Sequence, residues 1–181
     1  MQRYTPDLTA KAPKGQKEAK MPSLAQMEME RHPWPSVTCG CGRPSDHILD
    51  WLKEGIEGNG VALRALDGHV FIQSNLQPPA PAVCAVAVAA LADTQSLDQS
   101  KQLLWLILSL AAGEEDGDSA ESSIYWKCRE TIRDGLWLIY HEAVTSNVRT
   151  IEQYALDIAE ITEWDIDRLH SYQQKVRGFK A

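Results

Sequence analysis

The chain has 181 residues, of which 44% are hydrophobic and 24% are charged, and its formal net charge is -7. These values exclude a wholly disordered chain, because the apolar fraction is too high. They also exclude a nucleic-acid binder held by phosphate contacts, because such a protein needs a basic face. No apolar run reaches the ~18 residues that a membrane-spanning helix needs, so we expect no membrane contact. The chain has too few cysteines for a disulfide scaffold, and its first 20 residues contain no signal peptide. We therefore expect a cytoplasmic location.

Residues 1–44 differ in composition from the rest of the chain. They hold six of the nine prolines and few large apolar residues before Trp34, which predicts a flexible or irregular segment. Within this segment we expect one or two helical turns that begin at Ser23. Residues 32–44 are expected to be irregular, with Trp34 anchoring them to the fold. We therefore place the folded helical domain at residues 45–181.

Six helices are predicted from hydrophobic periodicity and from capping residues. They span about residues 45–58, 81–92, 96–113, 120–145, 151–161 and 162–178. The third contains the run LLWLILSLAA, which is apolar on all sides, so we expect it to be the central helix of the core. Ser96, Thr150 and Thr162 are each followed three residues later by Gln or Asp, a pattern typical of a helix start.

One β-hairpin is predicted, at about residues 61–73. Apolar residues alternate with others on both sides of Asp67-Gly68, a dipeptide typical of two-residue hairpin turns. The expected cross-strand pairs are Ala65 with Val70 and Leu63 with Ile72. The sequence therefore predicts a mainly α fold, a single-domain helical bundle of about six helices with one small β-hairpin and a flexible N-terminal tail.

The negative charge is concentrated in one part of the chain. Residues 111–170 contain fourteen acidic and five basic residues, a net charge of -9. A localised acidic surface speeds association with a basic partner and makes it selective, although solvated helix faces have the same composition. The predicted partner-binding residues are Glu114, Glu115, Asp116, Asp118, Glu152, Glu160, Glu163, Trp164, Asp165 and Asp167. Trp164 is either the aromatic anchor of this surface or a core residue at a helix corner.

Cys39-Gly-Cys41, with His32 and His47 nearby, loosely resembles a metal-binding cluster. Zinc is usually held by two C-x2-4-C pairs, whereas here a single residue separates the cysteines and the sequence has no second pair, so His47 or His32 would have to complete the ligand set. The alternative is a pair of free thiols in a glycine-rich turn, or a redox-sensitive pair. We predict no cofactor and no metal, and keep Cys39, Cys41 and His47 as the candidate ligands if a metal is bound.

No catalytic motif is present. His141-Glu142 does not extend to an H-E-x-x-H motif, because position 145 is Thr. A Glu-Glu-x-x-Asp run at Glu114 is comparable to the Mg²⁺ ligands of small helical nucleotide pyrophosphohydrolases, but glycines interrupt it. We expect a non-enzymatic interaction protein, an inhibitor or bacterial immunity-type protein that neutralises a basic toxin or nuclease. The alternatives are a metal-dependent helical hydrolase acting on nucleotides and a subunit of a larger complex.

Overall fold

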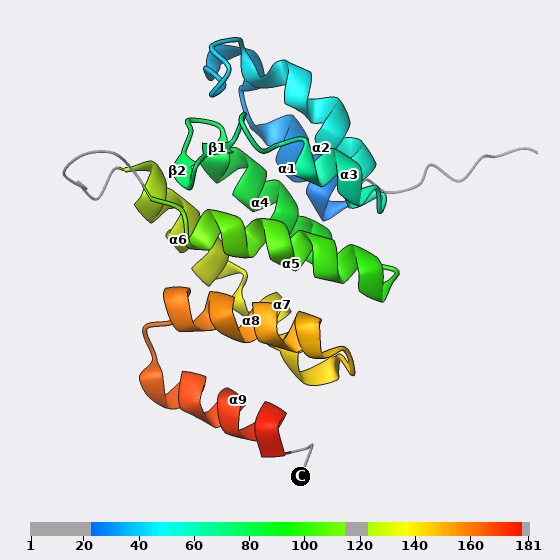
Figure 1. The fold of residues 1–181 in the computed structure, drawn as a ribbon, viewed down its shortest axis with the longest axis vertical. Coiled ribbons are helices and arrows are strands. Elements are labelled where there is room, and N and C mark those ends of the chain that lie inside the picture. Colours follow the sequence, from blue (N-terminus) through cyan, green and yellow to red (C-terminus); the bar gives the residue numbers. More distant parts are fainter. Residues whose placement is uncertain (1–22, 115–122, 179–181) are drawn as a thin grey trace, which may run out of the picture.

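The computed structural model describes residues 23–114 and 123–178, and within them it is predominantly helical (Figure 1). The α-helices are α1 (Leu24–Arg31), α2 (Leu49–Ile56), α3 (Gly60–Arg64), α4 (Ala80–Leu91), α5 (Leu97–Ala111), α6 (Ile124–Asp134), α7 (Leu136–Thr145), α8 (Arg149–Thr162) and α9 (Ile166–Gly178). Two 3-10 helices, η1 (Trp34–Ser36) and η2 (Ser45–Ile48), and two strands, β1 (Phe71–Ile72) and β2 (Asn75–Leu76), complete the fold. The predicted fold class, mainly α with one small hairpin, is confirmed.

Helices α4 and α5 form the centre of the molecule. Helix α5 packs against α4 on one side and against α8 on the other, and α4 also packs against α1 and α6. The predicted central run is buried as expected: Leu103, Leu104, Leu106, Ile107 and Leu110 are all 0% exposed. The predicted start of this helix is also confirmed, because the Ser96 side chain accepts a hydrogen bond from the backbone N–H of Gln99.

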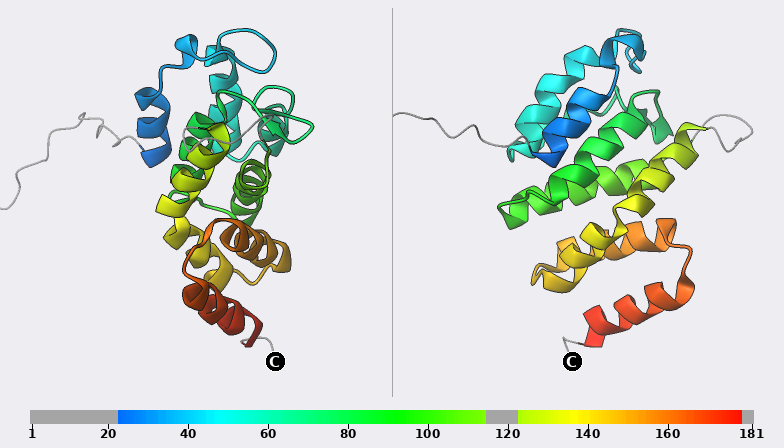
Figure 2. Two further views of the ribbon diagram at one scale, coloured as in Figure 1. Left: turned by 90° about the vertical axis from the view of Figure 1, so that its left-hand side faces the viewer. Right: turned by 180° about the vertical axis from the view of Figure 1, so that it is seen from behind.

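The molecule is elongated, with the chain running from one end to the other. The views in Figure 2 show α1, α2 and α3 at one end, α4, α5 and α6 in the middle, and α7, α8 and α9 toward the other end. Helix α9 contacts only the neighbouring α7 and α8 to a substantial extent among the described elements. The N-terminal and C-terminal ends of the described chain can therefore carry separate functions.

Residues 23–44 pack on the core more closely than their composition suggests. A helix does begin after Ser23, whose hydroxyl accepts from the Gln26 N–H, and this helix, α1, buries Ala25 and Met29 against α4. Trp34 is 3% exposed, and its Nε1 donates a 2.7 Å hydrogen bond to the Met29 carbonyl. The predicted tail of about twenty residues lies outside the described part of the chain.

The hairpin lies further along the chain than predicted. Residues predicted to form its first strand are helical instead, because Asn59 caps α3 by accepting from the N–H groups of Val61 and Ala62. The observed strand pairs are Phe71 with Leu76 and Ile72 with Asn75, so the predicted pairs of Ala65 with Val70 and Leu63 with Ile72 are wrong. Asp67-Gly68 does form a turn, with Gly68 at φ 80°, but this turn leads from α3 into β1.

Three further boundaries differ from the prediction. The expected long helix at 120–145 breaks at Gly135 into α6 and α7, where a side chain would collide with Val88 of α4. Thr150 lies inside α8, which begins at Arg149. Thr162 ends α8 and donates to the Ile158 carbonyl, while Asp165 caps α9 by accepting from the Arg168 N–H. Within the described ranges, no helix has both the length and the apolar character needed to cross a membrane.

Candidate metal centre

Four potential metal ligands converge at the end of the molecule that carries α2 and the hairpin. They are Cys39, Cys41, His47 and His69, and one ligand atom from each lies within 4.8 Å of all the others. The Cys39 Sγ lies 3.2 Å from the His69 Nδ1, and the Cys41 Sγ lies 3.6 Å from the His47 Nε2. The two imidazole nitrogens are 3.1 Å apart.

A tight turn positions the two cysteines. The Cys39 N–H donates to the Arg43 carbonyl at 2.7 Å, and the Gly42 N–H donates back to the Cys39 carbonyl at 2.8 Å, with Gly42 at φ 81°. The Gly40 N–H donates to the His69 carbonyl, which ties this turn to the histidine from the other segment. A side chain at Gly40 would have its Cβ 3.1 Å from that carbonyl oxygen, so the close approach favours glycine.

The two histidines come from different elements and are held by different contacts. His47 lies in η2, and its Nδ1 is 2.6 Å from the Pro44 carbonyl oxygen, which orients the ring and leaves Nε2 toward the cysteines. His69 follows the turn at Gly68. The Trp51 ring packs edge-on against both imidazoles, with ring centroids 6.0 Å from His47 and 4.9 Å from His69. Such contacts restrain ring orientation, as in established metal sites.

The two thiols have different environments. Burial raises the pKa of Cys39, which is 3% exposed. Cys41 is exposed, and hydrogen bonds from the side chain and backbone of Arg43 lower its pKa to about 6. The turn therefore already provides donors that stabilise a thiolate, the form in which cysteine binds a metal.

The spacing of the ligand atoms is comparable to that of a tetrahedral zinc site. Zn–N distances of ~2.0 Å and Zn–S distances of ~2.3 Å place the ligand atoms of a tetrahedron ~3.3–3.8 Å apart. Three of the six separations between the ligand atoms are 3.1, 3.2 and 3.6 Å, close to this range, and all six are at most 4.8 Å. Two sulfur and two nitrogen ligands are a set typical of structural zinc rather than of Mg²⁺ or Ca²⁺, which prefer oxygen. Four protein ligands leave no open coordination position, so the site has the character of a structural centre.

The structure brings together Cys39, Cys41 and His47, the three weak metal candidates of the sequence, and adds His69. Sequence reasoning missed His69, because it lies 22 residues beyond His47 and no ligand spacing connects them. The sequence offers one indication that His69 could bind a metal. It directly follows the Asp67-Gly68 turn, so its side chain can lie outside the regular elements. His32 does not join the group; its Nε2 lies 3.5 Å from a Glu28 carboxylate oxygen, and burial lowers its pKa.

The predicted acidic surface is divided between exposed and buried residues. Glu160, Trp164, Asp165 and Asp167 are exposed, and Trp164 is 68% exposed. In contrast, Glu152 and Glu163 are each only 6% exposed, so these two do not form part of an open surface. Glu114 is exposed beside the hairpin, where its backbone pairs with Ser74 and Leu76. Glu115, Asp116 and Asp118 lie outside the described residues.

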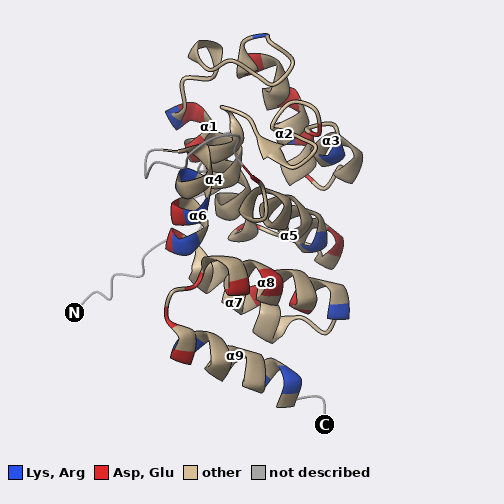
Figure 3. Cartoon of the chain, turned by 60° about the vertical axis from the view of Figure 1, so that its left-hand side comes forward, with Lys and Arg blue, Asp and Glu red and all other residues tan. Residues whose placement is uncertain are grey.

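Basic side chains also reduce the negative charge near α8 and α9. Figure 3 shows acidic residues along α8 and at the start of α9, with basic residues in the last turn of α9. A cleft of about 360 Å³ between these helices is lined by Glu152 and Glu160 but also by Arg149 and Arg177. The Arg133 guanidinium lies 3.3 Å from the centre of the Trp164 ring. This end of the molecule therefore has mixed charge.

Glu163 has a structural role in this region. Its carboxylate accepts hydrogen bonds from the Arg168 guanidinium at 2.6 and 2.8 Å, from the Tyr140 hydroxyl at 3.1 Å, and from the Asp165 N–H at 2.9 Å. Arg168 is the main reason that the pKa of Glu163 falls to about 2. This cluster joins α7, the α8–α9 connection and α9.

Comparison with protein-family models, with curated proteins and with solved structures finds no match for this chain.

Proposed function

We propose that this chain binds one zinc ion through Cys39, Cys41, His47 and His69, and that the ion organises the N-terminal end of a non-catalytic helical protein. The observation that carries the proposal is the convergence of four ligand atoms within 4.8 Å of one another. Three of these residues belong to the segment that joins α1 to α2, and the fourth lies between α3 and β1. A bound ion would cross-link two segments that are otherwise short and irregular.

The composition of the cluster supports binding of an ion. Two thiols and two imidazoles lie together, one thiol and both imidazoles partly reach solvent, and Arg43 stabilises a thiolate. A metal bound at such a site contributes its binding free energy to folding, because the site is not formed in the unfolded chain. Zinc is the metal that the donor set and its spacing fit best.

Metal analysis of the purified full-length protein tests this proposal. We expect about one zinc ion per chain, and Co²⁺ substitution should give the visible bands of a tetrahedral thiolate complex. Cys39→Ser and His69→Asn should each remove the zinc, whereas Cys84→Ala, which changes a buried thiol of α4, should retain it. Circular dichroism confirms that each variant is folded. Substoichiometric zinc, or zinc that survives both ligand substitutions, would refute the proposal.

A second candidate function is binding of a basic protein partner, as an inhibitor or immunity-type protein does, in the cytoplasm. It is supported by the exposure of Trp164 beside Glu160, Asp165 and Asp167. If this surface binds a basic partner, reversing Glu160 and Asp167 to Lys should weaken the complex and reduce its salt dependence. The test needs a basic protein that the native chain binds. If the double variant binds that protein with unchanged affinity, this surface is not the binding site.

A further inference from the structure

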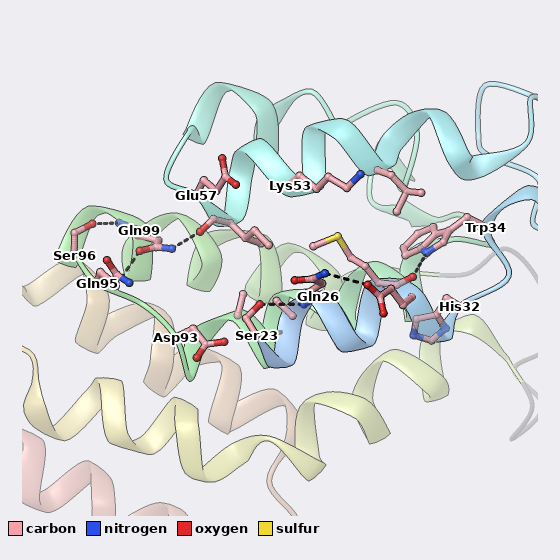
Figure 4. Close-up of a pocket in the computed structure, with 16 residues that line it drawn as sticks. Ser23, Gln26, His32, Trp34, Lys53, Glu57, Asp93, Gln95, Ser96 and Gln99 are labelled. Carbon is pink, nitrogen blue, oxygen red and sulfur yellow. Dashed lines mark hydrogen bonds between the residues drawn. The ribbon is translucent and has the colours of Figure 1, made fainter. Parts of the chain in front are cut away.

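A groove runs between α1 and α2 at the same end of the molecule as the metal cluster, and we call it the N-terminal groove. Its volume is about 1010 Å³. Figure 4 shows Lys53 and Glu57 on the α2 wall and Gln26 on the opposite α1 wall. The segment that carries Cys39, Cys41 and His47 connects these two walls.

The groove combines an apolar lining with an acidic rim. Met29, Trp34, Leu49 and Ile56 supply its large apolar side chains. The ionisable groups along it are the carboxylates of Glu30, Glu57 and Asp93, the Lys53 ammonium and the imidazole of His32. Burial and the nearby Arg31 lower the pKa of His32, which disfavours the charged form of its ring. Among the described lining residues, the rim therefore has three acidic side chains and one lysine.

The three carboxylates differ in whether they already accept a hydrogen bond within the protein. Asp93 accepts from the Leu24 N–H at 3.2 Å, and Glu30 accepts from the Gln26 side chain at 3.0 Å. Within the described ranges, the Glu57 carboxylate has no hydrogen-bond or ion-pair partner. Lys53, the single cation, is 60% exposed and lies 3.9 Å from Asp50. The net attraction of the rim is thus for a cationic group.

The walls of the groove determine how a ligand can be recognised. Both long walls are helices, whose backbone N–H and C=O groups are satisfied within the helix, so an extended peptide cannot pair with them as a strand. Recognition must use side chains, as when an amphipathic helix lays its apolar face into a groove. Of the large apolar side chains of the groove, Leu49 and Ile56 are partly exposed, whereas Met29 and Trp34 form its buried base at 7% and 3% exposure.

We propose that the N-terminal groove binds a basic amphipathic helix of a protein partner. The apolar face of that helix packs on Leu49 and Ile56, which are partly exposed, and its Lys or Arg side chains pair with Glu30 and Glu57. This inference does not depend on the zinc proposal. It places a basic partner, the kind expected for the second candidate function, on a surface far from α8 and α9 along the molecule.

A labelled leucine–lysine peptide of about four helical turns is a suitable probe, added to the full-length protein in a fluorescence anisotropy titration. We expect Glu30→Lys combined with Glu57→Lys to weaken binding by at least about tenfold. The matched control, Glu130→Lys combined with Asp134→Lys, makes the same charge change at two exposed positions of α6 and should leave the affinity within about twofold. Circular dichroism verifies that both double variants are folded.

Three results would overturn the proposal. One is an equal loss of affinity in the two double variants, which would mean general attraction to an acidic protein. Another is equal binding of a leucine–glutamate peptide, which would mean that the rim charges do not select the ligand. The third is a dimer in sedimentation that Glu57→Lys dissociates, which would assign the groove to a second copy of the chain.

Discussion

Two polar clusters, one near each end of the molecule, differ in how their groups are satisfied. Near the C-terminal end, the Glu163 carboxylate is surrounded by donors from Tyr140, Arg168 and the Asp165 backbone, and opposite charges lie in contact. Near the N-terminal end, the ligand atoms of two thiols and two imidazoles lie within 4.8 Å of one another, and Arg43 hydrogen-bonds the Cys41 thiol. The C-terminal cluster satisfies its charges with its own ion pair and hydrogen bonds, and it stabilises the fold. The N-terminal cluster has the composition of a site whose four ligands bind an added cation.

The largest expected effect is that of metal removal on the N-terminal cluster. If zinc binds the folded state alone, a free concentration of ~1,000 times Kd contributes about 4 kcal/mol to the free energy of unfolding. Chelation should therefore lower the thermal midpoint substantially, and the Cys39→Ser variant should unfold at the same temperature with and without chelator. The measurement is thermal denaturation followed by circular dichroism. An equal response to chelator in the native protein and in Cys39→Ser would contradict the comparison.

The next effect concerns the C-terminal cluster. Glu163→Gln keeps the shape of the side chain but removes the charge that Arg168 and Tyr140 contact, and we expect a loss of about 2 kcal/mol in unfolding free energy. The estimate is moderate because the Arg168 side chain is 33% exposed. Chemical denaturation measures it. Zinc content should not change in this variant, and a loss of zinc would show that the two clusters are coupled.

Acid should affect the C-terminal cluster through Glu163. Its pKa is about 2 in the folded protein, mainly because of Arg168, and 4.5 is the ordinary value. A lowered pKa means that the carboxylate stabilises the fold above pH 4.5, and that this stabilisation is lost as the pH falls from 4.5 toward 2. Glu163→Gln should flatten the stability curve in this window relative to Glu160→Gln, which changes an exposed carboxylate. Parallel curves for the two variants would contradict this assignment.

The smallest expected effect is that of Trp164→Ala. The indole ring is 68% exposed and contacts the guanidinium of Arg133 at the surface, so the loss in unfolding free energy should be below about 0.5 kcal/mol. Trp34→Ala, at 3% exposure in the N-terminal half, should cost about 3 kcal/mol or more. Denaturant titration compares the two. A large loss for Trp164→Ala would place this side chain in the core and not at a surface.

The helices with strong periodicity could be predicted from the sequence, and the metal cluster could be predicted only in part. Ser96 and the apolar run after it located α5 correctly, because capping and burial are both local in the sequence. The break at Gly135 depends on contact with Val88 of another helix, which no local pattern shows. His69 could not be predicted as a ligand, because no ligand spacing connects it to His47 and only the fold brings the two imidazoles together.

X-ray absorption at the zinc edge of the full-length protein tests the central claim most directly. Binding by Cys39, Cys41, His47 and His69 predicts a first shell of two sulfur atoms at ~2.3 Å and two nitrogen atoms at ~2.0 Å. A first shell made only of nitrogen and oxygen atoms would contradict the account, because the two cysteines would then not hold the ion.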